Sequence, residues 1–330
     1  MIIKLLLTFA FSFILTVAVG AVLVPTLRRI KAGQSIKKIG PSWHMSKQGT
    51  PTMGGIMFII GMGVSSFVMG IPAMKGGDYR HIFVFVFGLV FAAIGFVDDF
   101  QKLRKKQNTG LTAMQKLVLQ IAAAIAFVFL LRSYGYLSPN LYIPFFEITI
   151  PLNEVVYFAF AAFVIVGCVN AVNLTDGVDG LASGVSIPVA LFYVVISAKW
   201  GYESLGIFGA GMTGALMGFL VYNFHPAKVF MGDTGSLYLG GIVCAMAFAM
   251  DMPLVLVTLG FVYIIETLSD IIQVLYFKIS HGKRIFKMAP IHHHFEMCGW
   301  SEEKVFAVFS LVSAVFAVIS YLAVYGRYGL

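Results

Sequence analysis

Long apolar stretches separated by short polar connections run through the whole chain. A helix needs about 20 mostly apolar residues to cross a bilayer. About ten stretches meet or approach that length: residues 3–27, 53–71, 81–97, 112–131, 154–174, 181–198, 204–222, 235–250, 253–277 and 304–325. The third and eighth are short, which suits helices buried by their neighbours. Alternating side chains at 139–151 predict a short β-hairpin on the outer surface. The pattern predicts an all-α, polytopic membrane protein with one domain over residues 1–330.

Composition agrees with a membrane protein and excludes a soluble one. Hydrophobic residues make up 59% of the chain and charged residues 12%, about half the charged fraction of a soluble domain. One soluble core cannot hide that much apolar surface, so the bilayer must serve as solvent. The net charge of +8 does not indicate nucleic acid binding, because the basic residues lie in short connections between apolar stretches. We interpret them as orientation signals and as contacts for anionic lipids and substrates.

The basic residues also predict an orientation. With ten spans the connections alternate between the two sides of the membrane. One side holds the basic clusters near residues 28–47, 102–116, 228 and 278–304, whereas the other holds only scattered lysines and arginines. Because basic loops stay on the cytoplasmic side, we expect this richer side to face the cytoplasm and both termini to lie outside.

Five aspartates from three distant segments fall on the predicted cytoplasmic side. Asp98 and Asp99 end the third stretch, Asp176 and Asp179 follow the fifth, and Asp233 precedes the eighth. Like charges at a low-dielectric boundary repel each other unless a cation neutralises them. Carboxylate oxygens without thiolate companions suit a hard divalent ion, and Mg²⁺ is usual where phosphates complete its shell. The acids and nearby lysines therefore predict phosphoryl chemistry on a membrane-embedded substrate.

Each of these signals has a purely structural alternative. A single acid at a helix end is often only a cap, and this applies to Asp233. Residues 49–55 resemble an anion-binding helix start, but Thr52 as an N-cap and a proline turn explain much of that block. The alternation of aspartate and glycine at 176–180 is harder to explain by capping, since its glycines permit close approach to a ligand.

Two further polar features lie near the end of the chain. The consecutive histidines 292–294 cannot all point one way, and zinc ligands are normally spaced along an element. We therefore expect hydrogen bonds to a sugar or a phosphate. Glu266 and Asp270 lie one helical turn apart inside the ninth stretch. Acids within a membrane span are usually functional, but these two also suit a helix that bends toward water, and the sequence leaves both possibilities open.

Taken together, five blocks resemble a known family, the polyprenyl-phosphate N-acetylhexosamine-1-phosphate transferases. The blocks cover residues 47–55, 97–102, 170–180, 223–236 and 289–296. The histidine block points to the branch that transfers phospho-N-acetylmuramoyl-pentapeptide. The resemblance implies ten helices in the bacterial cytoplasmic membrane, with a broken ninth helix as a candidate wall of a groove for the lipid. It also implies the first membrane step of peptidoglycan synthesis, in which UDP-N-acetylmuramoyl-pentapeptide and undecaprenyl phosphate give lipid I and UMP with Mg²⁺. A homodimer is a further expectation.

The resemblance also implies residue roles. Asp233 resembles the Mg²⁺ ligand, and Asp98 and Asp99 resemble the catalytic pair. In this scheme Asp98 receives the proton of the lipid phosphate or keeps that phosphate ionised. The remaining motif positions resemble contacts to uridine, sugar or phosphate: Lys47, Thr52, Lys102, Lys116, Asn173, Asp176, Asp179, His292, His293 and His294. Asn223 resembles a polar partner beside the metal.

Three alternatives stay open at the level of sequence. The lipid phosphate attacks the donor directly, or an aspartate attacks first and forms a covalent intermediate. A sister transferase would use another UDP-N-acetylhexosamine. A transporter would place acids near the midplane and show inverted repeats; only Glu266 and Asp270 favour it.

Overall fold

The computed structural model describes residues 1–30, 47–105 and 110–327 and is mostly helical. Its elements, in chain order, are α1 (Ile2–Arg29), α2 (Gly55–Lys75), α3 (Arg80–Lys105), α4 (Ala113–Ser133), β1 (Asn140–Ile143), β2 (Ile148–Pro151), α5 (Glu154–Thr175), α6 (Leu181–Trp200), α7 (Glu203–Asn223), α8 (Gly232–Ala249), η2 (Pro253–Val255), α9 (Leu256–Leu259), α10 (Phe261–Ile279), α11 (Ile291–Met297) and α12 (Glu302–Val324).

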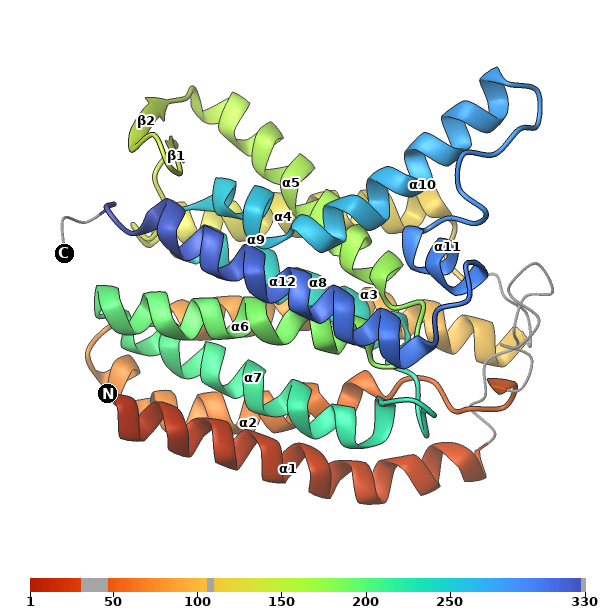
Figure 1. The fold of residues 1–330 in the computed structure, drawn as a ribbon. Helices are drawn as coiled ribbons and strands as arrows, with labels where there is room; N and C mark the ends of the chain where they lie inside the picture. Colours follow the sequence, from red (N-terminus) through yellow and green to blue (C-terminus); the bar gives the residue numbers. More distant parts are fainter. Residues whose placement is uncertain (31–46, 106–109, 328–330) are drawn as a thin grey trace.

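The arrangement confirms a polytopic helical membrane protein. Within the described residues, eight helices are long and apolar enough to span a bilayer, or nine if the bent pair formed by 253–259 and α10 counts as one. The start of α1 and the end of α12 lie at the same end of the bundle (Figure 1). The predicted hairpin is present, because β1 and β2 pair antiparallel with Asn140 opposite Pro151. Four lysines used in the orientation argument lie outside the described residues: 31, 37, 38 and 106.

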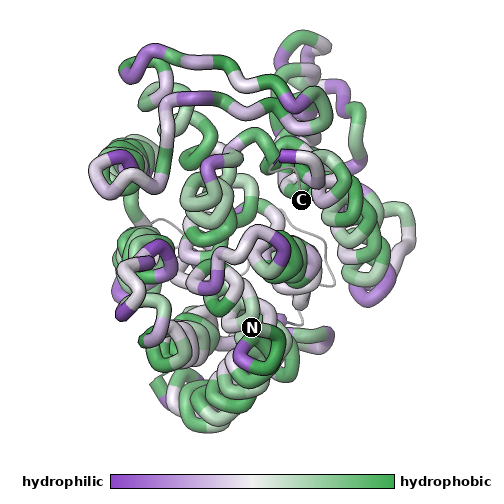
Figure 2. Tube along the Cα trace, turned by 90° about the vertical axis from the view of Figure 1, so that its left-hand side faces the viewer, coloured by the Kyte–Doolittle hydropathy of each residue, from purple (hydrophilic) through white to green (hydrophobic). Residues whose placement is uncertain are grey.

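The helices form a centre and a periphery. Helix α8 is buried along almost its whole length, and α7 along most of it. Helix α8 packs against α2, α3, α5 and α6. The peripheral helices expose large apolar side chains such as Leu6, Phe163 and Leu311, as expected for surfaces that face lipid. Figure 2 shows hydrophobic residues along the helices and most hydrophilic ones in the connections.

The ninth predicted span is broken. A 77° bend separates residues 253–259 from α10, and the break falls at Gly260, which ends α9 and precedes α10. In Figure 1, α10 then leans away from the other helices. One face of α10 is apolar and exposed, whereas the opposite face buries Glu266, Ser269 and Gln273.

The third helix is longer than its apolar pattern indicated. We expected it to end at residue 97, just before the adjacent aspartates, but α3 continues to Lys105. Asp98 and Asp99 are 0% and 4% exposed, so they lie on the buried side of a continuing helix. After the gap, a capping box formed by Thr112 and Gln115 starts α4 and places Lys116 in its first turn.

Candidate active site

Three aspartates meet where α3 and α8 pack together. We call Asp98, Asp99 and Asp233 the aspartate cluster. Each offers a carboxylate oxygen within 4.8 Å of the others. Asp98 and Asp99 come from α3, and Asp233 from the first turn of α8. The expected convergence of these residues, far apart in the chain, is therefore present.

A glycine permits this close approach of the two helices. Gly232 has a φ of +73°, and a Cβ there would lie 2.8 Å from Asp99 Oδ2 and 2.7 Å from Thr52 Oγ1. The following backbone can then reach Asp99. The amide N–H of Asp233 donates to Asp99 Oδ1 (3.2 Å), and the amide and hydroxyl of Thr234 donate to Asp99 Oδ2 (2.9 and 2.7 Å). Asp99 is thus fixed by the start of α8.

Two lysines bridge the other two aspartates. Lys102 Nζ lies 2.6 Å from Asp98 Oδ2 and 3.0 Å from Asp233 Oδ2. Lys116 Nζ lies 3.0 Å from Asp98 Oδ1 and 2.8 Å from Asp233 Oδ2. The amide of Leu111 also donates to Asp98 Oδ1, at 2.7 Å. Three carboxylates and two ammonium groups leave the cluster with one negative charge in excess, which favours a further cation.

Helix α5 completes this site. Asn173 Nδ2 donates to Asp233 Oδ1 (3.2 Å) and to Ser236 Oγ (2.7 Å). Asp176 follows at the end of α5 and is partly buried. Burial raises the pKa of Asp176 well above its ordinary value, and the nearby carboxylates of Asp233 and Asp99 raise it further. An anion at this position is therefore costly until a cation arrives.

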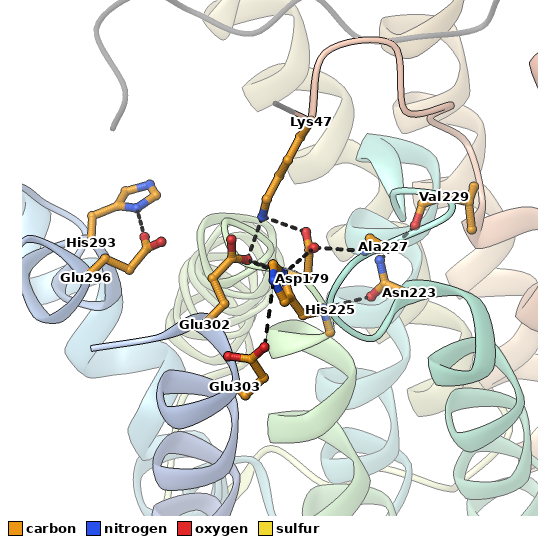
Figure 3. Close-up of polar contacts among 11 residues, drawn as sticks. Lys47, Asp179, Asn223, His225, Ala227, Val229, His293, Glu296, Glu302 and Glu303 are labelled. Atoms are coloured by element: carbon orange, nitrogen blue, oxygen red, sulfur yellow. Dashed lines mark hydrogen bonds and ion pairs between the residues drawn. The ribbon is translucent and has the colours of Figure 1, made fainter. Parts of the chain in front are cut away.

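A second polar cluster lies beside the first. We call Lys47, Asp179, His225 and Glu302 the Lys47 cluster (Figure 3). Lys47 Nζ lies 2.8 Å from Asp179 Oδ1 and 2.5 Å from Glu302 Oε2. His225 Nδ1 lies 3.1 Å from Asp179 Oδ2, and the amide of Ala227 donates to the same oxygen at 2.9 Å. Four segments far apart in the chain are thus joined by one network, in which Asp179 and Glu302 are buried.

The Lys47 cluster lines a cavity of about 600 Å³. Its wall also includes Thr50, Pro226, Ala227, Glu296, Gly299, Trp300, Ser301 and Glu303. Asp179, His225 and Glu302 are close enough to hold a metal. However, the aspartate cluster offers three carboxylates and no imidazole, which suits a hard divalent ion better, so we interpret this cavity as a ligand pocket.

The three histidines point in different directions, as expected. His292 is fully buried, and its Nδ1 lies 2.9 Å from Glu266 Oε2, which is also fully buried. Its Nε2 faces Gly177, where a Cβ would lie only 2.3 Å away. His293 Nδ1 lies 2.6 Å from Glu296 Oε2, and His294 Nδ1 accepts from the amide of Lys287. Helix α11 is therefore held against the 176–180 loop through His292.

Two expectations differ from the observed contacts. The start of α2 does not offer all its N–H groups to an anion, because Gly54 and Gly55 donate to the carbonyls of Phe230 and Met231. Asn223 accepts from the amide of Gly180 and donates to Val229 O. These contacts place Asn223 beside the Lys47 cluster and not against Asp233. Thr52, by contrast, is buried next to Gly232 and thus close to Asp99.

Sequence reasoning missed Glu302 and left Glu266 unassigned. Glu302 stands in the first turn of α12, after the N-cap Ser301, where an acid is already explained by the helix dipole. His225 belongs to the polar block 223–236 but was given no role of its own. For Glu266 the signal was its position within an apolar span, and the structure supplies its partner, His292.

The donor set of the aspartate cluster fits a hard divalent cation. Three carboxylates supply oxygen ligands, with neither thiolate nor imidazole among them, and the neighbouring amide of Asn173 adds a polar contact. Mg²⁺ is bound in proteins by one or two carboxylates together with water and phosphate oxygens. Asp98, Asp99 and Asp233 would hold such an ion once a lysine has moved aside.

Comparisons with known proteins agree with this site. Residues 81–251 match the family model described as glycosyl transferase family 4. Residues 47–59 match signature 1 of the phospho-N-acetylmuramoyl-pentapeptide-transferases. A protein of that name from Clostridium acetobutylicum is 46% identical over 314 residues, covering 94% of this chain and 96% of the relative. The chain belongs to the phospho-N-acetylmuramoyl-pentapeptide-transferase family.

Other members of the family are similarly close. Phospho-N-acetylmuramoyl-pentapeptide-transferases from Staphylococcus carnosus and Oceanobacillus iheyensis are 46% and 44% identical to this chain. The alignments cover 93% and 96% of this chain, and 95% and 96% of the relatives. The family model spans the aspartate cluster and α5 to α8, while the signature covers Lys47 and Thr52. The aspartate cluster and three members of the Lys47 cluster, Lys47, Asp179 and His225, therefore lie in the matched ranges, whereas Glu302 lies outside them.

Proposed function

We propose that this transferase moves phospho-N-acetylmuramoyl-pentapeptide from its UDP donor to undecaprenyl phosphate, giving lipid I and UMP. The main observation behind this proposal is the convergence of Asp98, Asp99 and Asp233 with two lysines at one end of a membrane-embedded bundle. A water-soluble sugar nucleotide and a lipid phosphate can both reach such a position. The comparisons supply the family and, through the relatives' names, the transferred group.

The reaction exchanges one phosphoanhydride bond for another. An oxygen of the lipid phosphate bonds to the β-phosphorus of the donor, and the bond from that phosphorus to the oxygen of UMP breaks. UMP leaves with the electron pair. Two anions must approach each other, and this repulsion is the main obstacle. The site therefore contributes mostly positive charge and orientation.

Different residues of the chain supply the metal ligands, the phosphate contacts and the base. Asp98, Asp99 and Asp233 would hold Mg²⁺, which supplies positive charge to the leaving phosphate. Lys102 and Lys116 bind phosphate oxygens. Asp98 receives the proton of the acceptor phosphate, or keeps that phosphate fully ionised.

In this proposal, the uridine and sugar of the donor bind outside the aspartate cluster. The cavity of the Lys47 cluster takes the uridine and sugar, with Asp176 and Asp179 on the loop between the two clusters. His293 contacts Glu296, which lines this cavity, whereas Thr52 and His292 are buried and pack against Gly232 and Gly177 beside the path. We place the whole site at the cytoplasmic face, because the basic connections lie at this end of the bundle.

A donor-exchange assay tests the proposal. The purified chain, in detergent with undecaprenyl phosphate and Mg²⁺, receives either UDP-N-acetylmuramoyl-pentapeptide or UDP-N-acetylglucosamine. We expect lipid product and UMP in equal amounts from the first donor only. Turnover of UDP-N-acetylglucosamine alone would identify a sister transferase. The Asp233→Asn variant controls for contaminating activity.

The route of attack needs its own experiment. The enzyme is incubated with donor but without lipid acceptor, and its intact mass is then measured. Direct attack predicts an unchanged mass. An added phospho-sugar mass that disappears when the acceptor is supplied would establish a covalent intermediate instead. Of the two acids that suggested transport, Glu266 and Asp270, Glu266 is paired with His292, which disfavours a role for it in transport.

A further inference from the structure

The lysines of the aspartate cluster contact three of the four carboxylate oxygens of Asp98 and Asp233. Asp233 Oδ2 receives both Lys102 Nζ (3.0 Å) and Lys116 Nζ (2.8 Å). Asp233 Oδ1 receives the amide of Asn173. A carboxylate oxygen offers about two lone-pair directions, so both directions at Oδ2 are taken. The same lysines contact both oxygens of Asp98.

A divalent ion cannot simply be added to this arrangement. With both lysines in place, the ion would lie within a few ångströms of two ammonium groups, and the excess charge would become positive. Both lysines have partly exposed side chains, 23% for Lys102 and 24% for Lys116, whereas Asp98 is 1% exposed. The aspartate is fixed, and the lysines have flexible stems and a path to solvent. Displacement of a lysine is therefore the smaller rearrangement.

We propose that Lys102 and Lys116 compete with the metal for Asp98 and Asp233 while no donor is bound, and that a displaced lysine transfers to the donor's diphosphate. This inference rests on the proposed function, because it places the metal at the aspartate cluster. When a metal ion binds, the displaced ammonium group loses its carboxylate partner and favours a nearby anion. When the donor's diphosphate binds, it attracts the lysines away from the carboxylates of Asp98 and Asp233. Each ligand thus strengthens the binding of the other, as linkage requires. The two lysines act as positioning residues before they contact substrate.

Metal binding without substrate separates this idea from a purely phosphate-binding role. Mn²⁺ serves as the probe, and its affinity is measured by electron paramagnetic resonance on the purified chain in detergent. The variants are Lys102→Met, Lys116→Met and Asp233→Asn. Lys105→Met is the matched control, since Lys105 lies on the same helix and is exposed. We expect each of the first two variants to bind Mn²⁺ about tenfold more tightly than wild type.

The possible failures are distinguishable. If Asp233→Asn binds Mn²⁺ as wild type does, the proposed metal site is wrong. If Asp233→Asn loses binding but Lys102→Met and Lys116→Met bind equally or less tightly than wild type, the competition is wrong and the site stands. Lys105→Met should leave the affinity unchanged. Gel filtration and thermal unfolding establish that each variant is folded, and Lys102→Gln and Lys116→Gln replace any methionine variant that is not.

Discussion

Replacing Glu266 tests whether a buried acid controls the active site from within α10. Glu266 and His292 are both 0% exposed, and their side chains meet at 2.9 Å. In Glu266→Ala the imidazole Nδ1 loses its partner in a dry environment. A buried polar group left unsatisfied costs about 1–3 kcal/mol. Because about 1.4 kcal/mol corresponds to a tenfold change in rate, we expect turnover to fall between about fivefold and a hundredfold if the cost appears in the transition state.

The effect of replacing Glu266 can reach the active site through one residue, His292. His292 lies against Gly177, in the loop between Asp176 and Asp179. If His292 rotated away from Gly177, the loop would lose this packing contact. Glu266→Gln keeps an acceptor for Nδ1, so its loss should stay near fivefold, from about 1 kcal/mol for a weakened hydrogen bond.

The assay is the initial rate of UMP release at saturating donor and acceptor, together with thermal unfolding. Asp270→Asn is the matched control, one turn further along α10 and partly exposed, and it should retain full activity. The double variant Glu266→Ala with His292→Ala should be no slower than His292→Ala alone. If the two losses simply multiply, Glu266 does not act through His292.

Four other predictions address the metal, the base, the pKa of Asp176 and the orientation. Asp233→Asn should abolish the Mg²⁺-dependent part of turnover, and Asp98→Asn should lower turnover by about 10²-fold or more if Asp98 is a base; a normal Mg²⁺ titration in the first variant would remove Asp233 from the metal site. An acid whose pKa is raised by folding stabilises the protein while protonated, and this contribution is lost as the pH rises through the folded-state pKa. In metal-free protein, Asp176→Asn should therefore lose less thermal stability than wild type between pH 5 and pH 8, and identical pH profiles would contradict the raised pKa of Asp176. Cys298 is exposed at the end of α11, so a membrane-impermeant maleimide should label it in inverted vesicles and not in intact spheroplasts, with Cys298→Ser as the control; the reverse labelling would place the site outside.

The sequence predicted the architecture well because lipid imposes simple rules. Apolar stretches of sufficient length gave nearly every helix, and alternation gave the β1–β2 hairpin. The positions of Asp98, Asp99 and Asp233 relative to those stretches were enough to predict that they converge. The case for a functional role of Asp98 and Asp99 was strong, because a purely structural role does not readily explain two adjacent acids at a lipid boundary.

The errors arose where a charged residue serves more than one purpose. Charges normally end an apolar span, so α3 was expected to stop at residue 97. Lys102 and Lys116 neutralise Asp98, and the helix can continue. Glu302 resembled an ordinary first-turn acid, and its contact with Lys47 spans 255 positions in the chain. Pairings across such separations depend on how the helices pack, which local patterns do not specify.

The enclosed position of α8 has a consequence for biogenesis. This helix carries Asp233 and several glycines, and it is not among the helices of the described residues that are long and apolar enough to span a bilayer. A segment of this kind partitions weakly into lipid when it leaves the translocon alone. The four helices that surround it, α2, α3, α5 and α6, all precede it in the chain. During synthesis, α8 is therefore the last helix of this group to leave the ribosome, and its four neighbours are already available to pack against it.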